Sequence, residues 1–226
     1  MVSPSVIVAT SSIEPTPMAR AVDLDDLIPG ATPWELEIGF GKGRYLLERA
    51  ASRPQTRFAG IEVASKYFRL VAKRIRRRRL SNVIVLRGEA LYLLSAMLPA
   101  GFARAVHVYF PDPWPKSRHQ KRRLFEADTL DLLLRTLEVG GKLFFATDHL
   151  EYGDTVRTLL ESHPGIRLRV RERGWEDGPR TNYEAKYVRE GRPICRFEIE
   201  RSATSLAELL HPEGAAKILS AAASRE

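Results

Sequence analysis

Cysteine and long apolar runs are nearly missing from this chain. Cys195 is its only cysteine, which excludes an intrachain disulfide and favours a reducing compartment. No run approaches the roughly 20 apolar residues that a membrane span needs. The short apolar patch at residues 6–9 has no basic residue before it, so it is not expected to be a signal peptide. We therefore expect a cytoplasmic protein.

Metal-ligand spacing is missing as well. The chain has five histidines, and they are not spaced as the ligands of a metal site are. Cys195 falls in an apolar stretch far from every motif, so we expect a packed side chain there and not a catalytic thiol. The sequence thus predicts neither a metal centre nor covalent catalysis by cysteine.

Acids are the minority charge, and the basic surplus is concentrated. Lys and Arg number 36 against 28 Asp and Glu, which gives a formal net charge of +8. Residues 69–79 hold seven basic residues and no acid, and a second cluster covers residues 116–123. Clustered cations favour a nucleic-acid partner. Each can also be an ordinary solvated side chain, and for residues 76–79, at a predicted helix end, the two interpretations carry equal weight.

Short apolar runs alternate with amphipathic stretches from Trp34 onward. Strands are predicted at residues 34–38, 57–61, 83–87, 105–110, 142–147, 166–171 and 194–200. Helices are predicted between them at residues 44–51, 66–79, 90–98, 123–137 and 151–162. This alternation indicates an α/β fold with a mostly parallel, seven-stranded sheet and helices on both faces. Residues 1–31 are expected to form a loose arm, residues 32–201 the domain, and residues 202–226 a helical tail.

The most informative stretch is Y-F-P-D-P-W-P-K-S-R-H-Q-K-R-R, at residues 109–123. Proline fixes its own φ and pushes the preceding residue toward an extended conformation, so Asp112 and Trp114 are presented on a stiff segment. A single acid beside an aromatic ring, followed by a run of cations, suits an exposed base on a polyanion. The alternative is a proline-rich turn that leads into a solvated basic helix.

Acids end or follow five of the predicted strands. They are Glu37, Glu62, Glu89, Asp112 and Asp148. Ligands of open α/β sheets bind outside the carboxyl ends of the strands, so these side chains are expected to converge on one edge. Any one of them, taken alone, is expected to be the N-cap of the following helix. That all five are only caps is much less expected.

A glycine-rich loop separates the first predicted strand from the first helix. Gly39, Gly41 and Gly43 allow positive φ angles and a close approach of the backbone to a ligand. Arg44 stands where the dinucleotide fingerprint has its third glycine, which counts against a nicotinamide dehydrogenase. The G-x-G-x-G spacing resembles that of methyltransferases that use S-adenosylmethionine. Glu62, at a strand end, would supply an acceptor for ribose hydroxyls.

Together these motifs resemble the bacterial tRNA (guanine-N(7)-)-methyltransferase family. The resemblance covers residues 34–200, and its most specific part is P-D-P-W-P-K-S-R-H-Q-K-R-R. L-E-I-G-F-G-K-G, G-I-E-V, T-D-H and T-N-Y-E support it. The resemblance implies a Rossmann-like class I fold and methyl transfer from S-adenosylmethionine to N(7) of a guanine in the variable loop of tRNA.

The resemblance and the motifs imply a set of site residues. The cofactor is expected to contact Glu37, Gly39, Gly41, Gly43, Glu62, Glu89 and Asp112. The tRNA is expected to contact Lys116, Arg118, Lys121, Arg122, Arg123, Asp148, Thr181, Asn182, Tyr183 and Glu184. Asp112 is the expected active-site residue. Because guanine N(7) has a lone pair and no proton, we expect Asp112 to orient and stabilise charge, not to abstract a proton.

Several of these residues have a second expected role. Thr181 and Glu184 form a capping-box pattern, which can coexist with binding. Asp148 can cap the helix that follows it, and Trp114 either stacks on a base or braces its loop. Glu89 is one methylene longer than the Asp or Asn usual in the family, which makes its adenine-side contact less certain.

Two other functions fit part of the sequence. A non-catalytic RNA-binding module would explain the basic clusters, but not the glycine loop together with five strand-end acids. A methyltransferase for a small molecule would keep the cofactor site without needing the basic clusters. The N-terminal arm is acidic, with Arg20 as its one basic residue, so a tRNA contact through it is in doubt. The sequence leaves the oligomeric state open.

Overall fold

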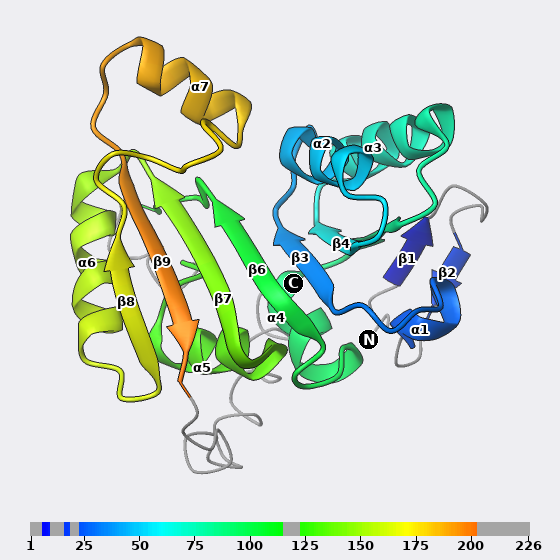
Figure 1. Cartoon of the computed structure of the whole chain (residues 1–226), viewed down its shortest axis with the longest axis horizontal. Helices are drawn as coiled ribbons and strands as arrows, with labels where there is room; N and C mark the ends of the chain where they lie inside the picture. The colour runs from blue at the N-terminus through cyan, green and yellow to red at the C-terminus, as the bar shows by residue number, and fades with distance from the viewer. Residues whose placement is uncertain (1–5, 10–15, 19–22, 115–122, 203–226) are drawn as a thin grey trace.

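A single mixed sheet organises the chain in the computed structural model, which describes residues 6–9, 16–18, 23–114 and 123–202. The strands of the described residues are β1 Val6–Ala9, β2 Thr16–Met18, β3 Trp34–Ile38, β4 Arg57–Glu62, β5 Val83–Arg87, β6 Ala103–Tyr109, β7 Leu137–Thr147, β8 Ile166–Val170 and β9 Cys195–Arg201. They form one nine-stranded sheet with the order β2-β1-β5-β4-β3-β6-β7-β9-β8 (Figure 1). The predicted Rossmann-like class is confirmed, whereas the count of seven strands was too low.

Parallel pairing is confined to the centre of the sheet. The strands β5, β4, β3, β6 and β7 pair with one another in that order, and all four of these pairings are parallel. At one edge β9 pairs antiparallel with both β7 and β8. At the other edge β1 pairs antiparallel with β5 and with β2. The five central strands therefore all end on the same side, and they position the candidate site.

The N-terminal segment differs from the expected loose arm. Its described part contains β1, β2 and the short helix α1, Leu24–Leu27. The sequence hides β1 because its four residues are flanked by prolines, and because one of the two strands that pair with it, β5, lies far along the chain. Pro17 lies in β2, an edge strand, where a missing N–H donor is tolerated.

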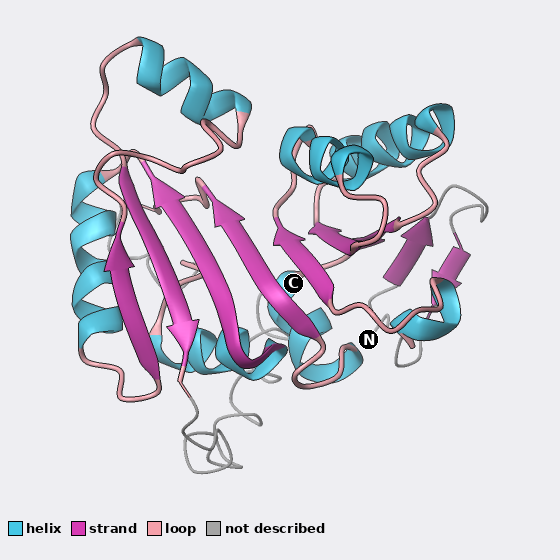
Figure 2. Ribbon diagram, viewed as in Figure 1, coloured by secondary structure: helices cyan, strands magenta, loops and turns pink. Residues whose placement is uncertain are grey.

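Helices cover the sheet on two faces (Figure 2). The helices of the described residues, besides α1, are α2 Arg44–Ser52, α3 Ser65–Arg78, α4 Ala90–Tyr92, the π-helix η1 Leu93–Met97, α5 Ala127–Thr136, α6 Leu150–Glu161 and α7 Asn182–Arg189. The helix predicted at residues 123–137 begins only at Ala127, because Arg123 and Phe125 are drawn into buried positions before it. Among the described residues, no helix is both long and apolar enough to cross a membrane.

Strand periodicity divides the core into two layers. Val83 and Val85 of β5 face α2 and α3 and pack with Phe58, Phe68 and other buried residues of that side. Ile84 and Leu86, which alternate with them, belong to the larger core beneath α4, η1, α5 and α6. Successive side chains of a strand point to opposite faces, so one apolar run supplies both layers.

On the sheet face that α2 and α3 cover in part, a loop and not a helix packs over β6 and β7. Residues 171–181 cross it, and Trp175 packs there with Tyr45, Tyr109 and Ala146. α7 follows this segment and lies above the upper ends of the strands (Figure 1). α7 is thereby brought to the same edge as the loop that follows β6.

The close approach of α2 and α3 gives a test of the fold. Gly43 has a φ of +69°, and a Cβ at this position would meet Val71 Cγ2 at 2.6 Å. Gly39 has a φ of +71°, but a Cβ there would meet nothing within 4 Å. Gly39→Ala should therefore cost only the left-handed strain, about 1 to 2 kcal/mol. Gly43→Ala should cost about 1 to 3 kcal/mol more, because it also overpacks the core.

Urea unfolding of the two variants beside the parent protein measures this difference. Equal losses in free energy of unfolding would show that Gly43 is required only for its φ angle, and would contradict the packing argument.

Candidate active site at the carboxyl edge of the sheet

The five strand-end acids lie on neighbouring strands. Glu89 follows β5, Glu62 ends β4, Glu37 lies near the end of β3, Asp112 follows β6 and Asp148 follows β7. Because the sheet order is β5-β4-β3-β6-β7, the acids occupy consecutive positions along one edge. The structure thus places the predicted residues as the parallel alternation implies. Their roles as ligands stay predictions.

The glycine loop has the backbone that its sequence requires. Gly39, Gly41 and Gly43 have φ angles of +71°, +51° and +69°, in the left-handed region that favours glycine. A Cβ on Gly39 would point into open space, and one on Gly41 would meet only the Gly39 carbonyl oxygen at 4.0 Å. The loop therefore offers bare backbone to a ligand at the end of β3.

Glu62 connects this loop to the neighbouring strand. Its Oε2 accepts a hydrogen bond from the Gly41 amide at 2.9 Å, and its Oε1 accepts one from the Ala64 amide at 2.8 Å. The side chain is buried. These bonds fix the carboxylate, while each oxygen keeps acceptor capacity for a further donor.

The surroundings of Glu37 disfavour the ionised form of its carboxyl group. It is buried, and its Oε2 has no hydrogen-bond partner among the described residues. Burial raises its pKa to about 8, and repulsion by Glu62 adds to that effect although a hydrogen bond from the Leu46 backbone opposes it. A buried carboxyl with an unsatisfied oxygen is suited to a ligand that brings a donor or a positive charge.

The loop after β6 has an unusual backbone. Phe110 and Trp114 have φ angles of +53° and +41°, although neither is a glycine. Such conformations cost on the order of 1 kcal/mol or more each and concentrate at functional sites. Asp112 lies exposed between them. The Phe110 ring packs against Tyr187 of α7, with ring centroids 5.6 Å apart, so the loop and α7 are in contact.

The structure shows whether Glu89 and Asp148 are helix N-caps. Glu89 is the N-cap of α4, and its Oε2 accepts a hydrogen bond from the Tyr92 amide at 2.8 Å. Asp148 does not cap α6; His149 does, through Nδ1 and the Tyr152 amide at 3.2 Å. The predicted cap at Asp148 was therefore wrong by one residue, and its carboxylate instead lies 3.6 Å from the Arg192 guanidinium.

The T-N-Y-E motif divides into buried and exposed halves. Thr181 caps α7 by accepting the Glu184 amide, at 3.0 Å. Glu184 is buried, and its carboxylate accepts hydrogen bonds from the Arg180 amide at 2.8 Å and the Arg196 Nε at 2.6 Å. The capping interpretation is confirmed for these two residues. Asn182 and Tyr183 are exposed, so they are the members of the motif that are accessible from solvent.

The basic cluster after the proline-rich motif is described only at its end. The predicted phosphate contacts Lys116, Arg118, Lys121 and Arg122 lie outside the described residues. Arg123 is buried; its Nε donates to the Pro113 carbonyl at 2.8 Å, and its guanidinium lies 4.9 Å from the centre of the Tyr152 ring. The predicted phosphate contact is corrected: Arg123 braces the motif, because the chain turns inward before α5.

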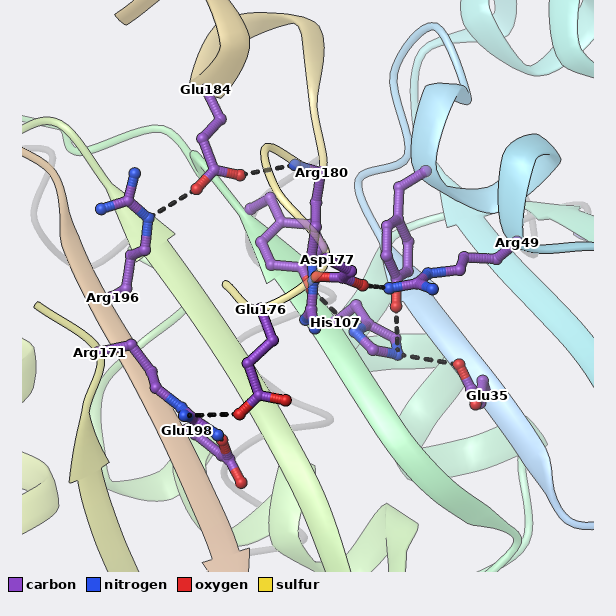
Figure 3. Close-up of polar contacts among 12 residues, drawn as sticks. Glu35, Arg49, His107, Arg171, Glu176, Asp177, Arg180, Glu184, Arg196 and Glu198 are labelled. Carbon is purple, nitrogen blue, oxygen red and sulfur yellow. Dashed lines mark hydrogen bonds and ion pairs between the residues drawn. The ribbon is translucent and has the colours of Figure 1, made fainter. Parts of the chain in front are cut away.

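A buried polar network beneath residues 171–181 was not predicted (Figure 3). The Arg180 guanidinium lies 4.4 Å from the Trp175 ring centre and 4.6 Å from that of Phe144, and it donates to the Tyr109 hydroxyl at 2.6 Å. His107 Nδ1 lies 2.9 Å from the same hydroxyl. The network ties the residue that precedes T-N-Y-E to the strand that carries the Asp112 loop.

His107 is neutral within this network. Burial lowers its pKa to about 4, although its hydrogen bond with Glu35 opposes the shift. Burial raises the pKa of Glu35, but the His107 hydrogen bond and the charges of Arg53 and Arg49 outweigh that effect and lower it overall. No signal in the sequence separates His107 from the apolar run around it, because its partners come from distant segments.

The large cavity of this face lies away from the edge. Its volume is about 740 Å³, and it is lined by residues of β3, β6, β7 and α2 and by residues of the segment 171–180, including Glu35 and Lys142. Most of its charges pair with one another: Arg53 lies 3.1 Å from Glu35, and Lys142 lies 2.7 Å from Glu198. A charged ligand would have to displace these pairs, so the cavity is the weaker candidate.

Comparison with known proteins shows the family to which the chain belongs. A family model described as "Putative methyltransferase" matches residues 31–197. The chain is 36% identical over 170 residues to the tRNA (guanine-N(7)-)-methyltransferase of Nitrosococcus oceani, which covers 75% of this chain and 72% of the relative. It is 34% identical to the protein of the same name from Alkalilimnicola ehrlichii, over 80% of this chain and 78% of the relative.

Solved structures share the fold. The antibiotic-resistance methyltransferase Kmr superposes with a TM-score of 0.59 at 22% identity, over 86% of this chain and 99% of that one. The 16S rRNA methyltransferase KamB gives a TM-score of 0.59 at 14% identity, over 87% of this chain and 99% of that one. From the family match and the identity to these relatives, the chain belongs to the methyltransferase family that includes the tRNA (guanine-N(7)-)-methyltransferases.

Proposed function

We propose that this chain transfers a methyl group from S-adenosylmethionine to N(7) of a guanine in the variable loop of tRNA. The observation that carries the proposal is the row of carboxylates at the carboxyl edge, joined to a glycine loop with open backbone. The relatives named tRNA (guanine-N(7)-)-methyltransferase support the same substrate.

The residues at this edge fit the cofactor. S-adenosylmethionine, when bound, supplies an electrophilic methyl group on a sulfonium cation. Gly39 and Gly41 leave room for it beside the backbone, and Glu62 has acceptor capacity for ribose hydroxyls. Glu37 presents a buried oxygen without a partner among the described residues. Glu89 would lie on the adenine side, with one oxygen already engaged by the Tyr92 amide.

Asp112 suits the guanine. Guanine N(7) carries a lone pair and no proton, so the chain needs no general base there. The methylated ring is cationic, and an exposed carboxylate beside it stabilises charge that develops during transfer. The constrained backbone at Phe110 and Trp114 fixes where this carboxylate stands. Asn182 and Tyr183, exposed on α7, are accessible to the tRNA from the neighbouring side.

Methyl transfer to unmodified tRNA tests the proposal. With methyl-labelled cofactor and tRNA transcript, nucleoside analysis should find 7-methylguanosine, in the variable loop. Asp112→Ala should lower the rate on the order of 100-fold, the magnitude typical of removing one group that stabilises transition-state charge. Asp154→Ala, an exposed acid on α6, is the matched control and should keep the parent rate.

A methyl group on another atom or another nucleic acid would contradict the proposed substrate, and transfer only to small molecules would favour that rival enzyme class. Unchanged turnover in Asp112→Ala would remove Asp112 from the active site without affecting the assignment of the substrate.

Glu37 makes cofactor binding pH-dependent. With a pKa of about 8 the carboxyl is mostly protonated at pH 7 in the free protein. A bound cation favours the ionised form and so lowers that pKa, which releases a proton. Cofactor binding at pH 7 should release close to one proton from this group, measured by calorimetry in buffers of different ionisation heat. Affinity should rise as the pH increases from 7 to 8.

Glu37→Gln keeps the size of the side chain and cannot ionise, so it should abolish this proton release. The same release in the variant and the parent protein would place the ionising group elsewhere.

A further inference from the structure

A second pocket lies beside the glycine loop, outside the row of acids. Its volume is about 320 Å³, and six of its lining residues are polar or charged donors. They are Lys42, Arg44, Arg74, Arg77, Arg78 and Asn182. Glu48 is the one acid among the residues that line it. The pocket therefore has a strong positive potential.

Three separate segments build the pocket. Lys42 and Arg44 come from the glycine loop and the start of α2, and Arg74 comes from α3. The Arg74 guanidinium donates to the Lys42 carbonyl at 2.7 Å, which joins α3 to the loop. Arg44 donates to the Asn182 side-chain oxygen at 3.5 Å, which brings in α7. The contacts fix these cations around one space, so they are not merely neighbours on a single helix.

Several other arginines on this side of the sheet have carboxylate partners. Arg49 pairs with Asp177, Arg53 with Glu35 and Arg196 with Glu184. In the part of the chain that the structure describes, Lys42, Arg77 and Arg78 form no ion pair, and Arg44 has only Glu48. Lys42, Arg77 and Arg78 thus bring positive charge to the pocket that no carboxylate of the described residues neutralises.

The helix dipoles explain the pocket cations at the end of α3, but not those at the start of α2. Cations in the last turn of a helix are stabilised by its dipole, which accounts for Arg77 and Arg78 at the end of α3. The same dipole disfavours cations at the start of a helix. Lys42 and Arg44 stand at the start of α2, where the structure has no acid in the first turn. An anionic ligand would offset the charge at both helix ends.

We propose that this pocket binds the phosphodiester backbone of the tRNA at a point away from the target guanine. Arginine suits phosphate because its planar donors form paired hydrogen bonds with two oxygens. Such contacts give affinity and register but do not read the base. The proposal rests on the proposed function, and it names where that enzyme holds its substrate. Through Asn182 and Lys42 the pocket lies between α7 and the cofactor loop, so a bound backbone is held next to the carboxyl edge.

The test compares two double variants of α3 with the same change in charge. Arg77→Gln/Arg78→Gln removes two exposed pocket cations. Arg69→Gln/Lys73→Gln removes two exposed cations that do not line the pocket. For each full-length protein, tRNA affinity is measured against salt concentration, with cofactor affinity and thermal unfolding as readouts of folding.

The pocket variant should bind tRNA more weakly, and its slope of log affinity against log salt should fall by about 2, roughly one for each phosphate that the variant no longer neutralises. Its cofactor affinity and unfolding temperature should match those of the parent protein, and the control variant should keep the parent slope. Equal slopes in the two variants would overturn the proposed site. If the parent protein neither binds nor methylates tRNA, it is the proposed function that fails.

Discussion

Parallel pairing of β3 with β4 and with β6 is the constraint on which the site depends. It makes five strands end together, so that acids separated by more than a hundred residues share one edge. A slip of one residue in this register would turn Glu37 from one face of the sheet to the other. The hydrogen bond from the Gly41 amide to Glu62 then locks the glycine loop against the neighbouring strand. The order of the strands and this hydrogen bond thus hold the residues that we propose to bind the cofactor.

The substrate side of the site depends on a different device. The segment before α7 is anchored by Arg180, whose guanidinium is enclosed by aromatic rings and bonded to the Tyr109 hydroxyl. Tyr109 is the last residue of β6, and the strained loop with Asp112 begins directly after it. Glu184 closes the connection by holding both the Arg180 amide and Arg196. The T-N-Y-E motif and the Asp112 loop are therefore positioned by one buried network.

The local pattern of apolar and polar residues was sufficient to predict most of the central strands, but not to predict which side chains contact one another. The runs at residues 34–38 and 83–87 match β3 and β5 residue for residue, because both are short apolar stretches bounded by turn residues. The row of acids was predictable because strand order in an alternating α/β chain follows from general rules of connection. Arg123 was predicted to bind phosphate because nothing in its residue type distinguishes this buried arginine from the neighbouring cations. His107 looks like one polar residue in an apolar strand until Tyr45, from a distant segment, is placed beside it.

The 740 Å³ cavity and the carboxyl edge of the sheet are the two candidate places for the cofactor. Most charges of the cavity are paired with one another, whereas at the carboxyl edge Glu37 Oε2 has no hydrogen-bond partner among the described residues. A crystal structure of the protein with S-adenosylhomocysteine separates them directly. We expect the ligand beside the glycine loop and Glu62, within reach of Glu37. Density in the cavity lined by Glu35, Lys142 and Glu198 would contradict this account.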